Sequence, residues 1–297
     1  MMKPVARVHS KNADSCAGEV VVCWRKTFWN MGFILASIIF APIYFTLDAF
    51  ILFLFTTYLS LLVGHSVGMH RMMIHRSFEA NPIVEKILIY IGVLVGMAGP
   101  YGVIRIHDTR DWAQRQPHCH LFFSHKESFL LDLWWQLTCT FKFEKPPSFT
   151  IEPKYSQDRL FQWLEKTWRW HQLLLALLLY ILGGFDWVVW GIFVRVSLSV
   201  VGHWTITYFC HNPGPGRWRV KNAGVQASNI PGFGILTYGE CWHNNHHAFP
   251  ESARIGLEKG QCDPAWRFIQ ILNLIGLASK IGLPREENQR EDIALSS

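Results

Sequence analysis

The chain has 297 residues; half of them are hydrophobic, 17% are charged, and 14 Trp and 21 Phe are present. This composition, with a positive mean hydropathy, excludes an ordinary soluble enzyme and indicates an integral membrane protein. The net charge of +6 is not gathered into a basic stripe. We therefore expect no nucleic-acid partner and attribute the charge to Lys and Arg on the cytoplasmic side of membrane helices. The seven cysteines form no C-x-x-C pair, which favours reduced thiols in a cytoplasm-facing protein.

Residues 1–27 are polar and basic, and we predict that they form a cytoplasmic N-terminal segment. Their basic residues run up to a long apolar span, unlike the layout of a cleaved signal peptide. The apolar runs 28–45 and 49–63 are joined by Thr46, Leu47 and Asp48, which predicts a first transmembrane hairpin over residues 28–64. Its tip carries Asp48 and no Lys or Arg, so the positive-inside rule places both open ends in the cytoplasm.

Residues 65–171 are predicted to form a cytoplasmic or interfacial region. The region opens with His70 and His75, whose spacing corresponds to about 140° around an ideal helix; one helix could aim both rings inward. The Gly-rich apolar run 87–103 is either a third span or a helix in the membrane interface, and both alternatives stay open. Residues 105–120 are dense in charge and imidazole, and we expect them in the cytoplasm because they are too polar to span.

A second transmembrane hairpin is predicted over residues 172–210. The apolar runs 173–182 and 187–209 flank a Gly-Gly-Phe-Asp turn, and the tip again carries an Asp and no basic residue, which repeats the orientation of the first hairpin. Arg195 lies about 13 Å past Asp186 at the helical rise per residue. A charge at that depth is costly, so we expect Arg195 to face protein or a cavity instead of snorkelling to the lipid surface.

Residues 211–297 are predicted to form a cytoplasmic cap, which contains the sequence GECWHNNHHAFP at residues 239–250. In a helix, His243, His246 and His247 would occupy positions i, i+3 and i+4 and project from one face. Neutral imidazoles on one stripe are typical metal ligands, so this stretch predicts a metal site.

The expected fold is therefore all-α: one membrane domain over residues 1–297, with two helical hairpins, four spans and a histidine-rich cytoplasmic cap. The hairpins deliver more imidazoles to one membrane face than a single metal can use. We predict two metal ions, with iron as the expected element. The predicted ligands are His70, His75, His118, His120, His211, His243, His246 and His247.

Over residues 28–285 the chain resembles the membrane fatty-acid desaturases, specifically the acyl-CoA type with two transmembrane hairpins. GMHRMMIHRSF at residues 68–78 resembles the family's first histidine box, and residues 239–250 resemble its third box. The second box departs from the family pattern. After Trp112 and Ala113, the family motif W-A-x-x-H-x-x-H-H expects histidines at 116, 119 and 120, whereas this chain has glutamine, cysteine and histidine, with an off-register His118.

This departure leaves the ligand set open around the second box. His120 is in register with the family, and His118 could substitute for a missing ligand, whereas Cys119 would be an unusual thiolate ligand. His211 matches the family's extra ligand after the last span, although the family's Asn four residues earlier is Thr207 here. Two further histidines are held in reserve as alternative ligands: His107 and His203.

The resemblance implies an enzyme with two non-haem irons that uses O2 and two electrons to introduce a cis double bond into a long-chain acyl group. The acyl group could be attached to CoA, a carrier protein or a lipid. Electrons would come from a separate protein of ferredoxin, rubredoxin or cytochrome b5 type. The departures place the chain in a divergent bacterial branch, so we expect it in the bacterial inner membrane with termini and metal site cytoplasmic.

Two other functions remain open. One is hydroxylation or ketolation of a lipid or carotenoid on the same scaffold. The other is a catalytically impaired paralogue, suggested by the altered second box. Three acidic residues could orient the histidine rings: Asp108, Asp111 and Glu240. Several basic residues could meet an acyl carrier's phosphates or an electron donor: Arg105, Arg110, Arg217, Arg219 and Lys221.

Overall fold

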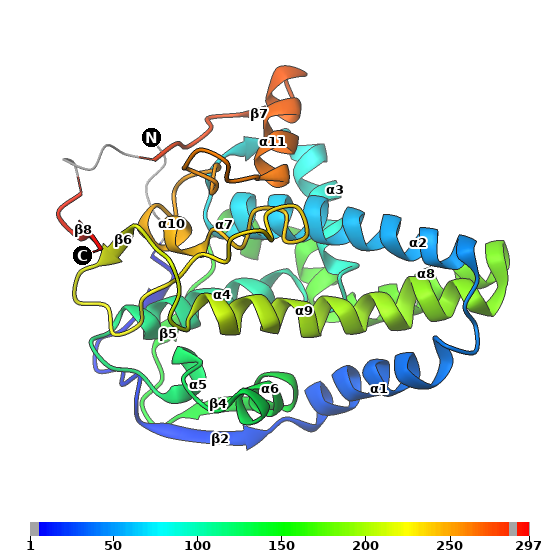
Figure 1. The fold of residues 1–297 in the computed structure, drawn as a ribbon, viewed down its shortest axis with the longest axis horizontal. Helices are drawn as coiled ribbons and strands as arrows, with labels where there is room; N and C mark the ends of the chain where they lie inside the picture. Colours follow the sequence, from blue (N-terminus) through cyan, green and yellow to red (C-terminus); the bar gives the residue numbers. More distant parts are fainter. Residues whose placement is uncertain (1–5, 285–289, 297) are drawn as a thin grey trace.

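The computed structural model of the protein describes residues 6–284 and 290–296, and the chain is mostly helical (Figure 1). The apolar runs of the sequence form long helices that lie roughly side by side, and the polar segments between them gather at one end. The helices are α1 (Trp24–Phe40), α2 (Leu47–Tyr58), η1 (Leu59–Ile74), α3 (Pro82–Val93), α4 (Pro100–Arg115), α5 (Leu121–Ser124), α6 (Phe129–Thr138), α7 (Pro153–Ser156), α8 (Arg159–Val188), η2 (Val189–Val194), α9 (Arg195–Cys210), α10 (His243–Ala248) and α11 (Pro264–Leu274).

Two continuous helical stretches are long and apolar enough to cross a membrane: Leu47–Ile74 and Arg159–Cys210. The second stretch reverses direction at Gly184, where φ is 80°, a backbone conformation that glycine adopts without steric cost. The preceding α1 has 17 residues and exposes Phe28, Leu35 and Ile38. These apolar surfaces agree with a membrane protein.

The tips of the two predicted hairpins meet at one end of the molecule. Thr46 Oγ1 donates to Asp186 Oδ2 at 2.9 Å, and Trp187 Nε1 donates to Asp48 Oδ2 at 2.6 Å. Both tips lie on the right in Figure 1, away from α4 and α10. Since the tips are joined, the other ends of the hairpins also share one side of the molecule.

The apolar run 87–103 divides into two elements instead of forming a third span. α3 ends at Val93 and α4 begins at Pro100. α3 has 12 residues and is therefore only about 18 Å long, which is too short to cross the roughly 30 Å of hydrocarbon in a bilayer. α3 packs along η1 because Gly64 and Gly68 bring the two backbones close to each other.

Arg195 faces protein, as the sequence predicted. Its residue exposure is 1%. The guanidinium donates to the carbonyl oxygens of Gly191 and Leu94 and, at 2.6 Å, to Gln172 Oε1. These acceptors satisfy a charge that would be costly if it faced lipid.

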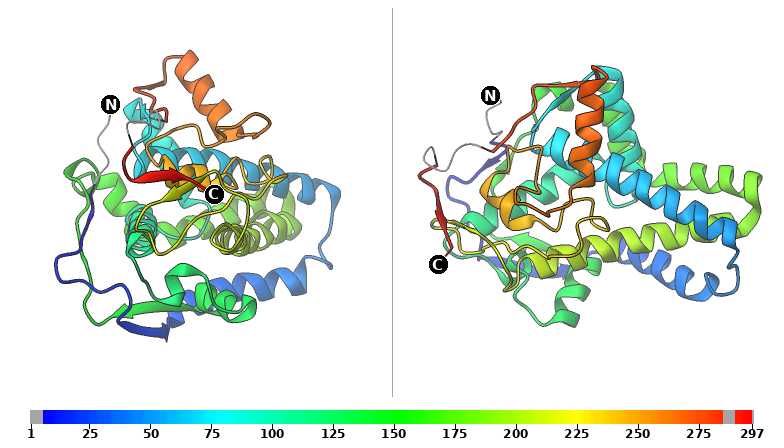
Figure 2. Two further views of the ribbon diagram at one scale, coloured as in Figure 1. Left: turned by 60° about the vertical axis from the view of Figure 1, so that its left-hand side comes forward. Right: turned by 45° about the horizontal axis from the view of Figure 1, so that its top comes forward.

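Short strands are the departure from the all-α expectation. Among the described residues they form four two-stranded antiparallel pairs. The pairs are β1 (Val8–His9) with β5 (Ser148–Phe149), β2 (Gly18–Val22) with β4 (Cys139–Phe143), β3 (Glu79–Ala80) with β7 (Ala278–Ser279), and β6 (Trp218–Val220) with β8 (Ile293–Leu295). Each pair joins segments far apart in the sequence. Figure 2 shows β8 beside β6 and α11 lying across η1.

Candidate metal centre

Seven imidazoles in the described part of the chain form two groups in which the candidate ligand atoms lie within 4.8 Å of one another. The first histidine group is His70, His75, His107 and His246, and the second histidine group is His211, His243 and His247. Six of these residues were predicted ligands, and His107 was held in reserve.

Local helix geometry explains how His70 and His75 reach one point. The backbone N–H of His75 bonds to the carbonyl oxygen of His70 at 3.0 Å, which is the i→i+5 pattern of a π-helical turn. This pattern places the second residue nearly above the first, so the two ring centroids are 4.8 Å apart. The wide angle expected for an ideal α-helix therefore does not apply here.

The short helix α10 contributes to both groups. His246 contacts His70 and His75, with ring centroids 4.6 and 4.4 Å away. His243 and His247 contact His211, with centroids 4.9 and 5.3 Å away. The histidine stripe read from the sequence is thus divided between two neighbouring sites.

Each group contains a pair of ring nitrogens that face each other. His75 Nε2 lies 3.2 Å from His107 Nε2, and His243 Nε2 lies 3.1 Å from His247 Nε2. Nitrogens at such separations could both bind one metal ion, because metal–nitrogen bonds are about 2.0–2.1 Å long. Two further ring nitrogens, His211 Nε2 and His246 Nδ1, are buried without a hydrogen-bond partner. The donor set therefore fits metal ions.

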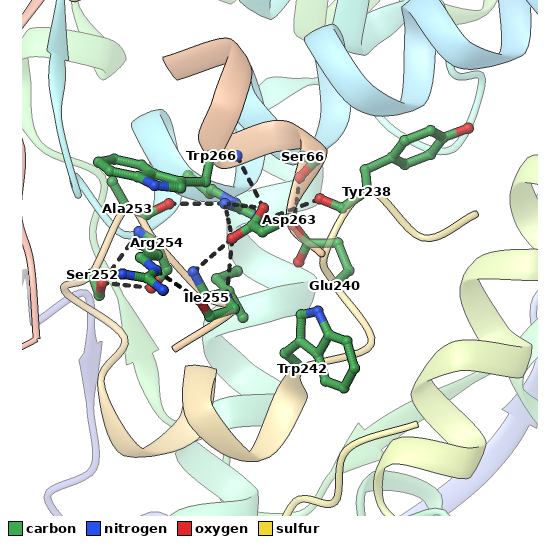
Figure 3. A network of polar contacts seen from close by, with 12 residues as sticks. Ser66, Tyr238, Glu240, Trp242, Ser252, Ala253, Arg254, Ile255, Asp263 and Trp266 are labelled. Atoms are coloured by element: carbon green, nitrogen blue, oxygen red, sulfur yellow. Dashed lines mark hydrogen bonds and ion pairs between the residues drawn. The ribbon is translucent and has the colours of Figure 1, made fainter. Parts of the chain in front are cut away.

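Two carboxylates hold rings of the first group. Glu240 Oε2 lies 2.8 Å from His70 Nδ1, and Asp108 Oδ1 lies 3.1 Å from His107 Nδ1. A carboxylate that accepts the Nδ1 proton leaves Nε2 free for a metal and makes the ring more basic. Ser66 also donates to Glu240, and Figure 3 shows both residues in the network that includes Asp263.

Burial keeps the imidazoles outside the helical spans neutral. It lowers the pKa of His211, His246 and His247 well below the ordinary value and that of His243 to about 3, with neighbouring histidines adding to the effect. Burial alone would raise the pKa of Glu240, but its interactions with His70 and Arg71 outweigh burial and hold the pKa of this carboxyl well below its usual range. At neutral pH these four imidazoles are therefore neutral nitrogen ligands, and Glu240 is an ionised carboxylate.

The second group lies among different neighbours. His211 Nδ1 donates to the carbonyl oxygen of Thr207 at 2.7 Å, and the carbonyl oxygen of His247 accepts a bond from Arg115 Nη2 at 3.2 Å. The positive charge of Arg110 contributes to the lowered pKa of both His211 and His243. Within residues 6–284 and 290–296, the carboxylate–histidine ion pairs involve His70, His107 and His125 and not a ring of this group.

The structure brings neither His118 nor His120 into the two groups, so the groups differ from the predicted ligand set at these two positions. α4 ends at Arg115, and Gln116 has extended backbone angles, so the following residues leave the face that carries His107. His118 is exposed. His120 caps α5 by accepting the Phe122 N–H at its Nδ1.

The other residues considered around the second box also lie outside both groups. Burial raises the pKa of the Cys119 thiol to about 11, so it is protonated at neutral pH and is a poor metal ligand. The ring of His203 contacts that of His65, with centroids 5.2 Å apart. Asp111 pairs with Arg115 at 3.1 Å.

Sequence reasoning gave no role to His125, which the structure places against the second group. This residue is fully buried, and its ring stacks on His211 with centroids 5.6 Å apart. Its Nδ1 bonds to Asp132 Oδ1 at 3.0 Å, and the same oxygen accepts the Trp204 indole N–H at 2.7 Å. A lone histidine between two short helices carried no spacing signal that could have revealed this contact.

The fold and the paired histidine groups define a helical protein with a centre that could hold two metal ions, on a scaffold with apolar membrane-type helices. The family model for fatty acid desaturases matches residues 47–258. The chain belongs to the fatty acid desaturase family, and it is an oxidoreductase.

Characterised relatives cover most of the chain. It is 32% identical over 264 residues to the sn-1 stearoyl-lipid 9-desaturase of Anabaena variabilis, with 88% of this chain and 94% of that protein aligned. It is also 32% identical to the acyl-CoA C20 Delta5-desaturase of Anemone leveillei, over 77% of this chain and 72% of that protein. The sn-2 palmitoyl-lipid 9-desaturase of a Nostoc strain is 32% identical over 83% of this chain and 86% of that protein.

Proposed function

We propose that this protein is a membrane-bound diiron desaturase that introduces a cis double bond into a long-chain acyl group. The observation that carries the proposal is the pair of adjacent histidine groups that share α10, in a chain of the desaturase family. The overall reaction would convert two neighbouring methylenes, O2, two electrons and two protons into a double bond and two water molecules.

In this proposal the first histidine group holds one iron and the second group holds the other. When bound, the two irons would supply the oxidant that O2 and two electrons generate for cleaving an unactivated C–H bond. The protein's own residues set the ring orientations. Glu240 and Asp108 hold Nδ1 of His70 and His107, and the Thr207 carbonyl holds Nδ1 of His211, so that Nε2 of each ring is free for metal.

The proposed topology has both hairpins crossing the membrane, with α1 as the first of four spans, in one domain over the whole chain. The joined tips at Asp48 and Asp186 support it, because neither turn carries Lys or Arg. The metal centre, at the other end of the hairpins, would then face the cytoplasm together with both termini. We place the protein in a bacterial inner membrane, as the divergence of its second box suggests.

The proposed substrate is a long-chain acyl group on a lipid or on CoA. The names of the relatives support both carriers, since they include acyl-lipid and acyl-CoA desaturases. A separate electron donor of ferredoxin, rubredoxin or cytochrome b5 type would complete the system.

The test is expression of the chain in a desaturase-deficient host, followed by mass spectrometry of its lipids. We expect a new cis double bond with wild-type protein and none with His246→Ala, which removes a ligand at the centre of the site. Lys259→Gln, at an exposed position in residues 211–297, is the control and should retain the product. A hydroxylated or keto product would show that the protein catalyses hydroxylation or ketolation and not desaturation. No product despite a reducing partner, with no bound iron, would identify an impaired paralogue.

A further inference from the structure

The two histidine groups differ in ligand number and in the charges behind them. We infer that they bind metal unequally: the first group (His70, His75, His107 and His246) takes the first ion tightly, and the second group (His211, His243 and His247) takes the second ion more weakly. This inference rests on the proposed two-metal function and concerns the order in which the centre is loaded.

Ligand number is the first reason. The first group offers four imidazoles, and the second offers three. A metal ion in the second group would therefore depend on at least one more ligand that is not an imidazole of that group. Fewer neutral nitrogen ligands mean a weaker site when the metal is the same.

Negative charge behind the first group is the second reason. Arg71 lies between two carboxylates, 3.1 Å from Glu240 and 2.9 Å from Asp263, so the three side chains carry a net charge of −1. Asp263 also accepts backbone N–H bonds from Ile255, Gly256 and Trp266, which hold its carboxylate in place beside Arg71. Figure 3 shows this network around Asp263, with Glu240 and Ser66 beside it.

A second carboxylate cluster supports His107. Arg7 is shared by Asp108 at 2.8 Å and Glu152 at 2.6 Å. Arg76, which is more exposed, lies 3.4 Å from Glu152 and offsets part of this charge. Asp108 nevertheless remains in direct contact with the His107 ring. Its negative charge therefore stabilises a cation bound to that ring.

The third reason is that the charges around the second group nearly cancel among the described residues. Arg115 donates to the carbonyl oxygen of His247, and its charge acts on both His247 and His75. The charge of Arg110 acts on His211 and His243. Each arginine has a carboxylate nearby: Asp111 pairs with Arg115, and Asp132 acts on Arg110. The surroundings of the second group are thus close to neutral, whereas those of the first group are negative. The surrounding charges therefore stabilise a divalent cation less in the second group than in the first.

Metal titration of the purified full-length protein tests this inference. Metal-free protein in detergent is titrated with Co²⁺, whose visible absorption reports coordination, and bound metal is counted by elemental analysis after a weak chelator is added. We expect two binding steps whose affinities differ by at least about tenfold, with one ion kept against the chelator. His211→Ala should retain the tight ion only, and His75→Ala the weak ion only.

Charge variants separate the electrostatic cause from the ligand number. Glu240→Gln should weaken the tight step by about 10–100-fold, the usual effect of losing an outer-shell partner, and leave the weak step unchanged. Arg110→Gln should strengthen the weak step, and the exposed Arg219→Gln should change neither. Thermal unfolding of each metal-free variant establishes that it is folded.

Equal affinities, or equal weakening of both steps by Glu240→Gln, would overturn the inference. A wild-type protein that binds a single ion would instead refute the proposed two-iron function. In that case the inference still has a clear result. Loss of that ion in His75→Ala would support the preference for the first group, and loss in His211→Ala would overturn it.

Discussion

At the residue scale, His107 is the candidate ligand that only the fold places in the first histidine group. Its ring lies 4.7 Å from that of His75 and 5.2 Å from that of His70, and Asp108 holds its Nδ1. We expect His107→Ala to lose about one metal equivalent and to lower desaturation by about 100-fold or more, because a ligand is lost as well as its outer-shell support.

His118→Ala is the matched control for His107→Ala, since it removes an imidazole from the same segment at an exposed position. Its metal content and lipid product should equal those of the wild type. Wild-type metal content in His107→Ala, or loss of metal in His118→Ala, would return the ligand role to the second box as first predicted.

The buried imidazoles also set a pH dependence. Burial lowers the pKa of His211, His246 and His247 far below the value of about 6.5 expected in the unfolded chain. Below pH 6.5 the unfolded chain takes up protons that these folded residues refuse, so the metal-free protein should lose stability as pH falls. At pH 5.5 the loss is about 1 kcal/mol for each such residue.

Thermal unfolding of metal-free protein between pH 7.5 and 5.5 measures this effect. The midpoint should fall steadily with acidification, and His211→Ala should show a shallower fall. A midpoint that is constant or rises over this range would show that these imidazoles are not held neutral in the folded state.

At the scale of elements, the contact between η1 and α3 positions the first histidine group. A Cβ at Gly68 would lie 2.9 Å from the backbone of Leu88, and one at Gly64 would collide with the backbone of Ile91 and Gly92. Backbone atoms cannot move aside as a side chain does, so Gly64→Ala and Gly68→Ala should each lower stability by about 1–3 kcal/mol. Separation of η1 from α3 should also reduce bound metal.

Gly32→Ala is the control for these variants. Gly32 lies inside α1, and a Cβ there meets nothing within 4 Å, so the change should be neutral or slightly stabilising because alanine favours helix. Thermal unfolding and elemental analysis compare all three proteins. Equal stability of Gly64→Ala and Gly32→Ala would mean that η1 and α3 do not pack as closely as described.

At the scale of the whole molecule, the joined hairpin tips predict one orientation in the membrane. Cysteine labels introduced at Asp48 and Asp186 should react with a membrane-impermeant reagent from outside the cell. A label at the exposed Arg219 of the cap should react only after the membrane is opened. This follows from the absence of Lys and Arg in both turns. Protection of either tip in intact cells would refute the two-hairpin topology.

Much of the fold and part of the site followed from short-range sequence patterns. Apolar runs separated by turn residues indicated the long helices, and the depth of Arg195 indicated that it must face protein. The spacing of His243, His246 and His247, and of His70 and His75, indicated metal chemistry. These are properties of contiguous residues, because helix periodicity alone determines which side chains share a face.

Contacts between distant segments decided the rest. Whether His107 or His120 belongs to the centre depends on where α4 ends and on how the chain leaves it. The division of the α10 stripe depends on His70, in η1, contacting His246 and on His211, at the end of α9, contacting His243. The short strands, the stacking of His125 on His211 and the carboxylate–arginine networks likewise join segments tens of residues apart. Such contacts arise from packing between elements, and packing depends on the whole chain at once. Only the tertiary structure therefore separated the imidazoles into two unequal groups.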